Sequence, residues 1–180
     1  MSSSGSTRGS IDSPVKPGND EHQGHPRARP EDPHITKFIT VINKWVNISA
    51  FEGSPPSGGA DRKYPQGPVY EIEDVERLAA QGSLQFWTRG AARDAQKWKL
   101  DTKDCAKLMQ LALHSGRFTG SEWCQQQPQG PWAMCDAYSV SRPEWIEHAG
   151  KHLNVSYYLK FAISKTGQLL LMASNHPEGA

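Results

Sequence analysis

Two neighbouring segments near the carboxyl end of the chain limit its fold more than any other feature. Residues 156–164 (SYYLKFAIS) alternate between apolar and other side chains, as in a strand with one buried face. That apolar face carries Tyr157, Leu159, Phe161 and Ile163. Residues 168–174 (QLLLMAS) form a continuous apolar run, which is typical of a central strand buried on both faces. The intervening KTG contains a glycine and predicts a hairpin turn, so the chain must build a sheet.

Three segments ahead of this hairpin predict helices. Apolar residues recur at helical spacing from Ile72 to Ala79, and Gly82 follows them. Thr88 is a good N-cap for a second helix, and Asp101 or Thr102 for a third that Gly116 ends.

Residues 117–138 read as two strands joined by the polar loop QQQPQGP. The whole pattern predicts an α+β fold in which about three helices pack on one face of a roughly four-stranded antiparallel sheet.

The amino-terminal third of the chain differs in composition. Residues 1–33 are rich in Ser, Gly, Pro and charge, so we predict a disordered tail. Residues 34–51 fit both helical spacing and the β-branched density of a strand, and we favour an amphipathic helix. Prolines and glycines mark 52–68 as a linker. The compact domain is therefore expected to cover 69–177.

Charge and cysteine content give no support to several classes of protein. The chain has 20 basic and 19 acidic residues, so net charge gives no general attraction to nucleic acid or to a membrane. Cys124 and Cys135 are too far apart in sequence for a zinc-type pair, and Cys105 fits a buried helix face. No segment has the length of a membrane span, and the first residues lack the apolar core of a secretion signal. We expect a cytoplasmic protein without membrane contact, metal or small-molecule cofactor.

The order of motifs over 69–176 resembles a known family. A second helix with Ala91-Ala92-Arg93-Asp94-Ala95 is followed by a strand with Trp132, Asp136 and Tyr138, a Tyr-x-Lys strand, and a Leu-rich final strand. This order resembles the MqsR toxins (motility quorum-sensing regulators), which belong with the RelE-like bacterial toxins. The resemblance implies a RelE-like fold and an mRNA interferase: the toxin of a type II toxin–antitoxin system, which cleaves mRNA without a metal. It also implies a cognate antitoxin protein as partner.

The resemblance also suggests roles for individual residues. Cleavage needs a base for the 2′-hydroxyl, cations for the phosphate and an acid for the leaving oxygen. Lys160 would hold the phosphate, and Tyr158, on the same face by strand alternation, would position it or donate a proton. Arg117 would replace a family lysine where this chain has Thr119, and His176 would serve as acid or base. The residues expected to bind substrate are Thr119, Trp132 and Tyr138.

Departures from the family pattern keep other functions open. The replaced lysine, the altered last strand and the equal numbers of acidic and basic residues over 69–180 are also typical of an inactive, toxin-like fold that binds or regulates a protein. A third alternative is an RNA-binding module without cleavage. Trp123 and Trp132 fit base stacking, but packing within the sheet is favoured. Residues 145–154 are interpreted as an insertion or a lengthened hairpin connection.

Overall fold

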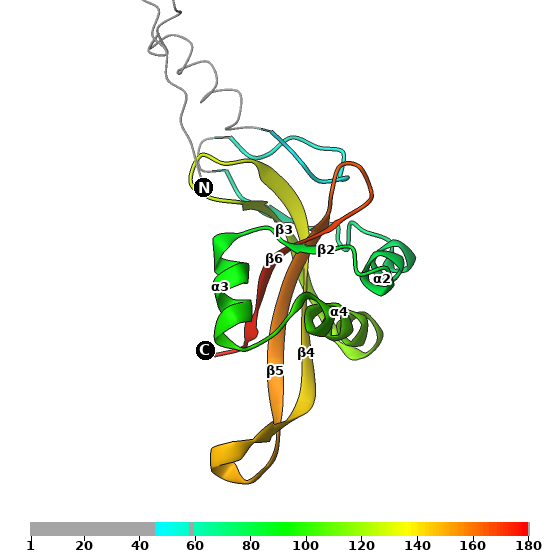
Figure 1. Ribbon diagram of the computed structural model, residues 1–180. Helices are drawn as coiled ribbons and strands as arrows, with labels where there is room; N and C mark the ends of the chain where they lie inside the picture. Colours follow the sequence, from blue (N-terminus) through cyan, green and yellow to red (C-terminus); the bar gives the residue numbers. More distant parts are fainter. Residues whose placement is uncertain (1–45, 58–59, 180) are drawn as a thin grey trace, which may run out of the picture. The chain divides into compact units, whose positions relative to one another are not determined.

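The computed structural model of the protein describes residues 46–57 and 60–179, and these residues form three α-helices and one six-stranded sheet (Figure 1). The helices are α2 (Ile72–Ala80), α3 (Arg89–Lys97) and α4 (Thr102–Ser115). The strands are β1 (Lys63–Tyr64), β2 (Leu84–Phe86), β3 (Arg117–Gln125), β4 (Trp132–Ile146), β5 (Lys151–Ile163) and β6 (Leu170–Pro177). A 3-10 turn, η1 (Glu147–Ala149), connects β4 to β5. No helix in the described part of the chain is long and apolar enough to cross a membrane.

The sheet has the strand order β1-β3-β4-β5-β6-β2. β2 pairs with β6 in parallel, and the other neighbours are antiparallel. The α+β class is therefore confirmed, but the sheet is mixed and has six strands among the described residues instead of about four antiparallel ones. The two additional strands, β1 and β2, are only 2 and 3 residues long, which is too short for an alternating pattern to reveal them.

The helices begin where the sequence predicts. The Thr88 hydroxyl accepts a hydrogen bond from the Ala91 amide at 3.0 Å and caps α3. Asp101 caps α4 through a capping box in which its carboxylate accepts from the Asp104 amide at 2.8 Å. Each cap satisfies helix N–H groups that have no partner within the helix, so local sequence alone fixes these starts.

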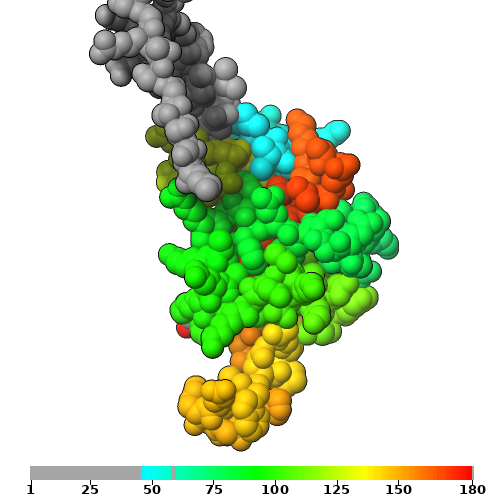
Figure 2. All heavy atoms as spheres, viewed as in Figure 1, coloured from blue at the N-terminus to red at the C-terminus, as the bar shows by residue number. Residues whose placement is uncertain are grey.

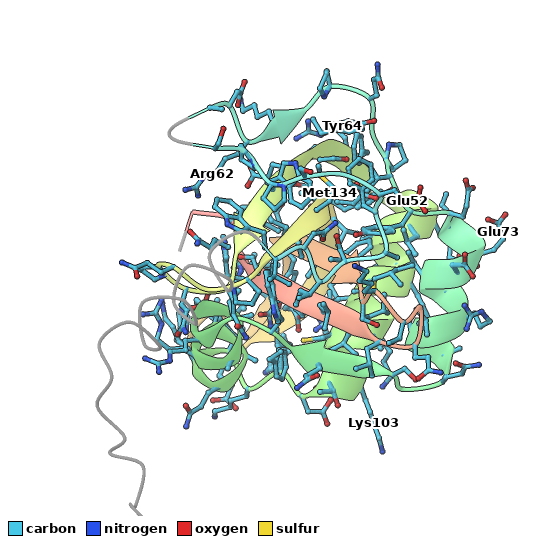
Figure 3. All side chains as sticks on the ribbon, turned by 90° about the horizontal axis from the view of Figure 1, so that it is seen from above. Glu52, Arg62, Tyr64, Glu73, Lys103 and Met134 are labelled. Carbon is cyan, nitrogen blue, oxygen red and sulfur yellow. The ribbon has the colours of Figure 1, made fainter. Side chains whose placement is uncertain are left out.

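The helices cover both faces of the sheet. In Figures 1 and 3, α2 and α4 lie on one side of the sheet and α3 lies on the other. We call the first side the two-helix face and the other the site face. The placement of α3 corrects the expectation that all helices share one face. The reason lies in the central strands: Leu170, Leu171 and Met172 of β6 are all buried, although successive side chains point to opposite faces. A strand that is apolar on both faces needs a cover on both.

An aromatic cluster anchors the two-helix face. The rings of Tyr138 and Phe161 are stacked with centroids 5.9 Å apart, and Phe118 meets Tyr138 edge-on at 5.4 Å. Leu159, which pairs in register with Tyr138, is fully buried. On the helix side, the Asn175 amide of β6 donates to the Cys105 thiol of α4 at 3.4 Å. The predicted apolar alternation along β5 is thus confirmed.

Residues 46–68 add to the sheet. Asn47 and Ser49 form bridges with Trp132 and Ser164, so the described part of the predicted 34–51 helix is extended instead of helical. The reason is that its backbone bonds with the ends of β4 and β5: the Ile48 amide donates to the Trp132 carbonyl at 2.9 Å. The predicted 52–68 linker contains β1, which pairs with β3. The predicted tail and residues 34–45 lie outside the described residues.

Strands β4 and β5 continue past their neighbours and form a projecting hairpin arm, which is the yellow and orange extension in Figures 1 and 2. The two strands pair up to Ile146 and Lys151, so the segment 145–154 is a lengthened hairpin connection. Gly150 makes the turn with φ +58°, a left-handed conformation that suits glycine. His152 packs edge-on against Trp145, which is 56% exposed.

Candidate functional site

Three of the predicted catalytic residues lie in one cross-strand row. Arg117 of β3 pairs with Ser139 of β4, Ser139 pairs with Tyr158 of β5, and Tyr158 pairs with His176 of β6. Residues paired across antiparallel strands point to the same face, so this row is on the site face. The Tyr158 and His176 rings have centroids 5.7 Å apart. The register therefore brings together residues that lie far apart in sequence.

Lys160 belongs to the next row. It pairs with Ala137 on one side and Ser174 on the other. The short side chain of Ala137 leaves the ammonium of Lys160 free to turn over the neighbouring strand. Its Nζ lies 5.4 Å from the centroid of the Tyr158 ring, a cation–π distance. Tyr158, Lys160 and His176 are thus one contiguous cluster.

Glu122 is the partner of Lys160. The Lys160 ammonium crosses β4 and forms an ion pair with the Glu122 carboxylate of β3. The side chain of Lys160 is only 15% exposed and that of Glu122 is 35% exposed. Burial by itself lowers the pKa of Lys160, but the Cys124 and Glu122 side chains more than offset this, so that the pKa is raised. Lys160 therefore stays charged at neutral pH.

Sequence reasoning missed Glu122 because of a β-bulge. Strict alternation places Arg117 and Glu122 on opposite faces of one strand. The β3–β4 register shifts between Phe118 and Gly120, which brings Glu122 onto the face of Arg117. Gly120 has φ +141°, a conformation open essentially to glycine alone. A glycine within a strand was the available signal, since glycine there often marks a bulge.

A cavity of about 490 Å³ opens beside this cluster. From the site face, Tyr158, Glu122 and Thr119 line it, and Lys63 and Tyr64 of β1 line its outer wall. Thr119, a predicted substrate-binding residue, is the extra residue of the bulge. A second cavity of about 390 Å³ is lined by Arg117 together with Ser139, Ser141, Ser156 and Glu178. Tyr158 lines the first cavity and Arg117 lines the second, so each cavity borders the row of these residues.

The structure places two other predicted substrate-binding residues away from this cluster. Tyr138 is 6% exposed in the aromatic cluster of the two-helix face, where burial and then Asp136 raise its pKa. Trp132 is also 6% exposed and packs with Trp123 and Met134 in a second, smaller core. The Arg62 guanidinium lies over the Trp132 ring at 4.9 Å. Trp123 and Trp132 therefore serve packing, as favoured from the sequence.

The Asp136 side chain is buried, and its hydrogen bonds serve the fold. Its buried carboxylate accepts hydrogen bonds from the Val69 and Tyr70 amides at 3.0–3.1 Å and from the Ser121 hydroxyl at 2.5 Å. Burial raises the pKa of Asp136, although these hydrogen bonds oppose the shift. The contacts fix the chain just before α2 against the sheet, so Asp136 holds the fold together beside the site.

Among the described residues, no group of three or more His, Cys, Asp or Glu side chains is arranged to hold a metal ion. No family model, curated protein or solved structure matches the chain.

Proposed function

We propose that the site face is the active surface of a metal-independent endoribonuclease that acts on single-stranded mRNA, as the toxin of a type II toxin–antitoxin system. The observation that supports this most is the cluster of Tyr158, Lys160 and His176 on one polar sheet face. A phenol, an ammonium and an imidazole lie side by side there, the phenol lines a cavity, and we propose that the three groups act on one phosphate group. The cognate antitoxin protein would act by covering this surface.

The cluster contains a candidate for each step of cleavage. The Glu122 carboxylate, beside Lys160, is the proposed base for the 2′-hydroxyl proton. As the 2′-oxygen bonds to phosphorus, the bond to the 5′-oxygen breaks and a 2′,3′-cyclic phosphate remains. Lys160 and Arg117 stabilise the negative charge on the phosphate oxygens. His176, with Tyr158 beside it, protonates the departing 5′-oxygen.

The ion pair of Lys160 is compatible with phosphate binding. An ammonium group has three N–H donors, so it can contact Glu122 and a phosphate oxygen together. In that arrangement Lys160 holds the base and the phosphate next to each other. Arg117 is exposed at the end of the row, where a second phosphate oxygen can reach it.

The test is RNA cleavage by purified protein in EDTA, after removal of any bound partner. Wild type should cut a mixed single-stranded RNA and leave cyclic phosphate ends, and Lys160→Ala should cut at least ~100-fold more slowly, the scale of one lost electrostatic group. Lys165→Ala, a change at an exposed lysine in the β5–β6 turn, is the matched control and should cut normally. Intact RNA at high enzyme excess would refute the proposal.

A second candidate function is a toxin-like fold that binds a protein without cleaving RNA. The observation that favours it is the Lys160–Glu122 ion pair, which already neutralises the most central cation of the site. Expression should then leave growth unaffected, and a stable protein complex should be recovered. Growth arrest by wild type but not by Lys160→Ala would eliminate this candidate.

A further inference from the structure

The two cysteines of the β3–β4 hairpin lie close together on the site face. Cys124 pairs in register with Ala133, and Cys135 pairs with Glu122. Each thiol therefore stands on the same face as the other, one diagonal step away on the adjacent strand. Cys135 is fully buried, whereas Cys124 is partly exposed. Cys124 is thus the more exposed residue of the pair, and Cys135 is the protected one.

Lys160 completes this group. Its side chain starts on β5 and crosses β4 to reach Glu122 on β3, two residues before Cys124 on the same strand. The crossing side chain runs over the same sheet face that carries both thiols, and its charge acts on each of them. Cysteines beside a lysine ammonium have a larger thiolate fraction than free cysteine, and the thiolate is the reactive form.

The electrostatics divide the two thiols into different roles. The hydrogen bond from Cys135, and then the charge of Lys160, lower the pKa of Cys124 despite its burial. Burial, and then Cys124, raise the pKa of Cys135 well above its usual range. The third cysteine, Cys105, lies on α4, where burial raises its pKa to about 11. Of the three cysteines, Cys124 alone is partly exposed and has a lowered thiol pKa.

We propose that Cys124 is a peroxide-reactive thiol and that Cys135 resolves its oxidised form as an intramolecular disulfide. The Cys124 thiolate attacks one oxygen of hydrogen peroxide, the O–O bond breaks, and the departing hydroxide takes a proton to become water. The product is a sulfenic acid on Cys124. The Cys135 sulfur then bonds to the Cys124 sulfur, the S–O bond breaks, and the hydroxide takes the Cys135 proton and leaves as a second water. Two thiols are oxidised and one peroxide is reduced.

The experiment treats the full chain with hydrogen peroxide and maps the cysteines by mass spectrometry of peptides without reduction. A Cys124–Cys135 cross-linked peptide should appear, while Cys105 stays reduced. In Cys135→Ser, the sulfenic acid on Cys124 should persist and react with dimedone. Cys105→Ser is the matched control and should form the cross-link as wild type does.

A second measurement uses wild type alone, so its outcome does not depend on whether the variants fold. With iodoacetamide and native wild type, Cys124 should be alkylated at least ~10-fold faster than Cys105, since a depressed thiol pKa and access both favour it. Equal rates at the two cysteines, or peroxide treatment that yields no Cys124–Cys135 cross-link, would overturn the proposal. Neither result depends on whether the protein cleaves RNA.

Discussion

Tyr157 and Tyr158 are neighbours on β5, yet they meet opposite environments. Tyr157 is 5% exposed on the two-helix face, and its hydroxyl donates to Glu144 at 2.9 Å. Tyr158 faces Lys160 and His176 beside the cavity. The same contrast holds along the strand for Phe161 and Lys160. Adjacent residues of one strand therefore carry separate tasks: one set holds the sheet to its helices and the other builds the site.

The largest expected effect is on the two-helix face. Phe161→Ala removes a ring that is 1% exposed and stacked on Tyr138, which leaves a cavity in the core. We expect the free energy of unfolding to fall by ~3–5 kcal/mol, to be measured by urea denaturation. Lys160→Ala, one residue away, is the comparison and should cost less. An equal loss for both variants would contradict the division of tasks between the faces.

The bulge in β3, which brings Glu122 onto the site face, provides the next test. Gly120→Ala places a side chain at φ +141°, so we expect a loss of ~1–3 kcal/mol in unfolding free energy from backbone strain. No heavy atom lies within 4 Å of the added Cβ, so crowding does not contribute. Gly90→Ala, at a helical position with a negative φ, is the control and should be neutral or stabilising. A Gly120→Ala variant of wild-type stability would show that the bulge is not under strain.

A smaller effect is expected from Glu122→Gln on the site face. The change removes the negative charge beside Lys160 while keeping the shape of the side chain. RNA affinity should rise by about 1 kcal/mol or less, as for a partly exposed ion pair, and cleavage should fall because the proposed base is lost. Fluorescence anisotropy at fixed salt and a cleavage assay measure the two quantities. Tighter binding with unchanged cleavage would assign the base to another group, and weaker binding would contradict the proposed phosphate position.

The smallest effect concerns pH and the carboxylate of Asp136. Because burial raises its folded pKa above the unfolded value, its favourable contribution is complete below about pH 4 and declines as pH rises through the folded pKa. Chemical denaturation from pH 3 to pH 8 should therefore show the stability of wild type, relative to Asp136→Asn, falling with pH. A difference that grows with pH would mean that the hydrogen bonds to the carboxylate outweigh its burial.

The parts of the fold that depend on local chemistry could be predicted from the sequence. The caps at Thr88 and Asp101 act within four residues, and the alternation along β5 shows its buried face directly. The register among β3, β4, β5 and β6 then aligned Arg117, Tyr158 and His176, which strand alternation alone does not specify. The common face of Tyr158 and Lys160 followed from their spacing of two.

Long-range pairing explains what the sequence did not reveal. Glu122 and Lys160 are 38 residues apart and meet only because a bulge changes the direction of one side chain. Tyr138 looked like a site residue from its motif, but its strand turns it toward the aromatic core. β1 was hidden within a Pro- and Gly-rich segment because two residues carry no period.

The hairpin arm has a consequence for how the molecule opens. Beyond Ser141 and Ser156, each strand of the arm pairs only with the other among the described residues, and Val155 at the base of the arm packs against the main core. Fluctuations that separate the two strands of the arm therefore expose little of the main core, and amide exchange there should be fast while the central strands stay protected. A protease should cut first near the η1 turn and leave the rest of the domain intact. We therefore expect that the outer part of the arm can be shortened or exchanged while the rest of the sheet remains folded.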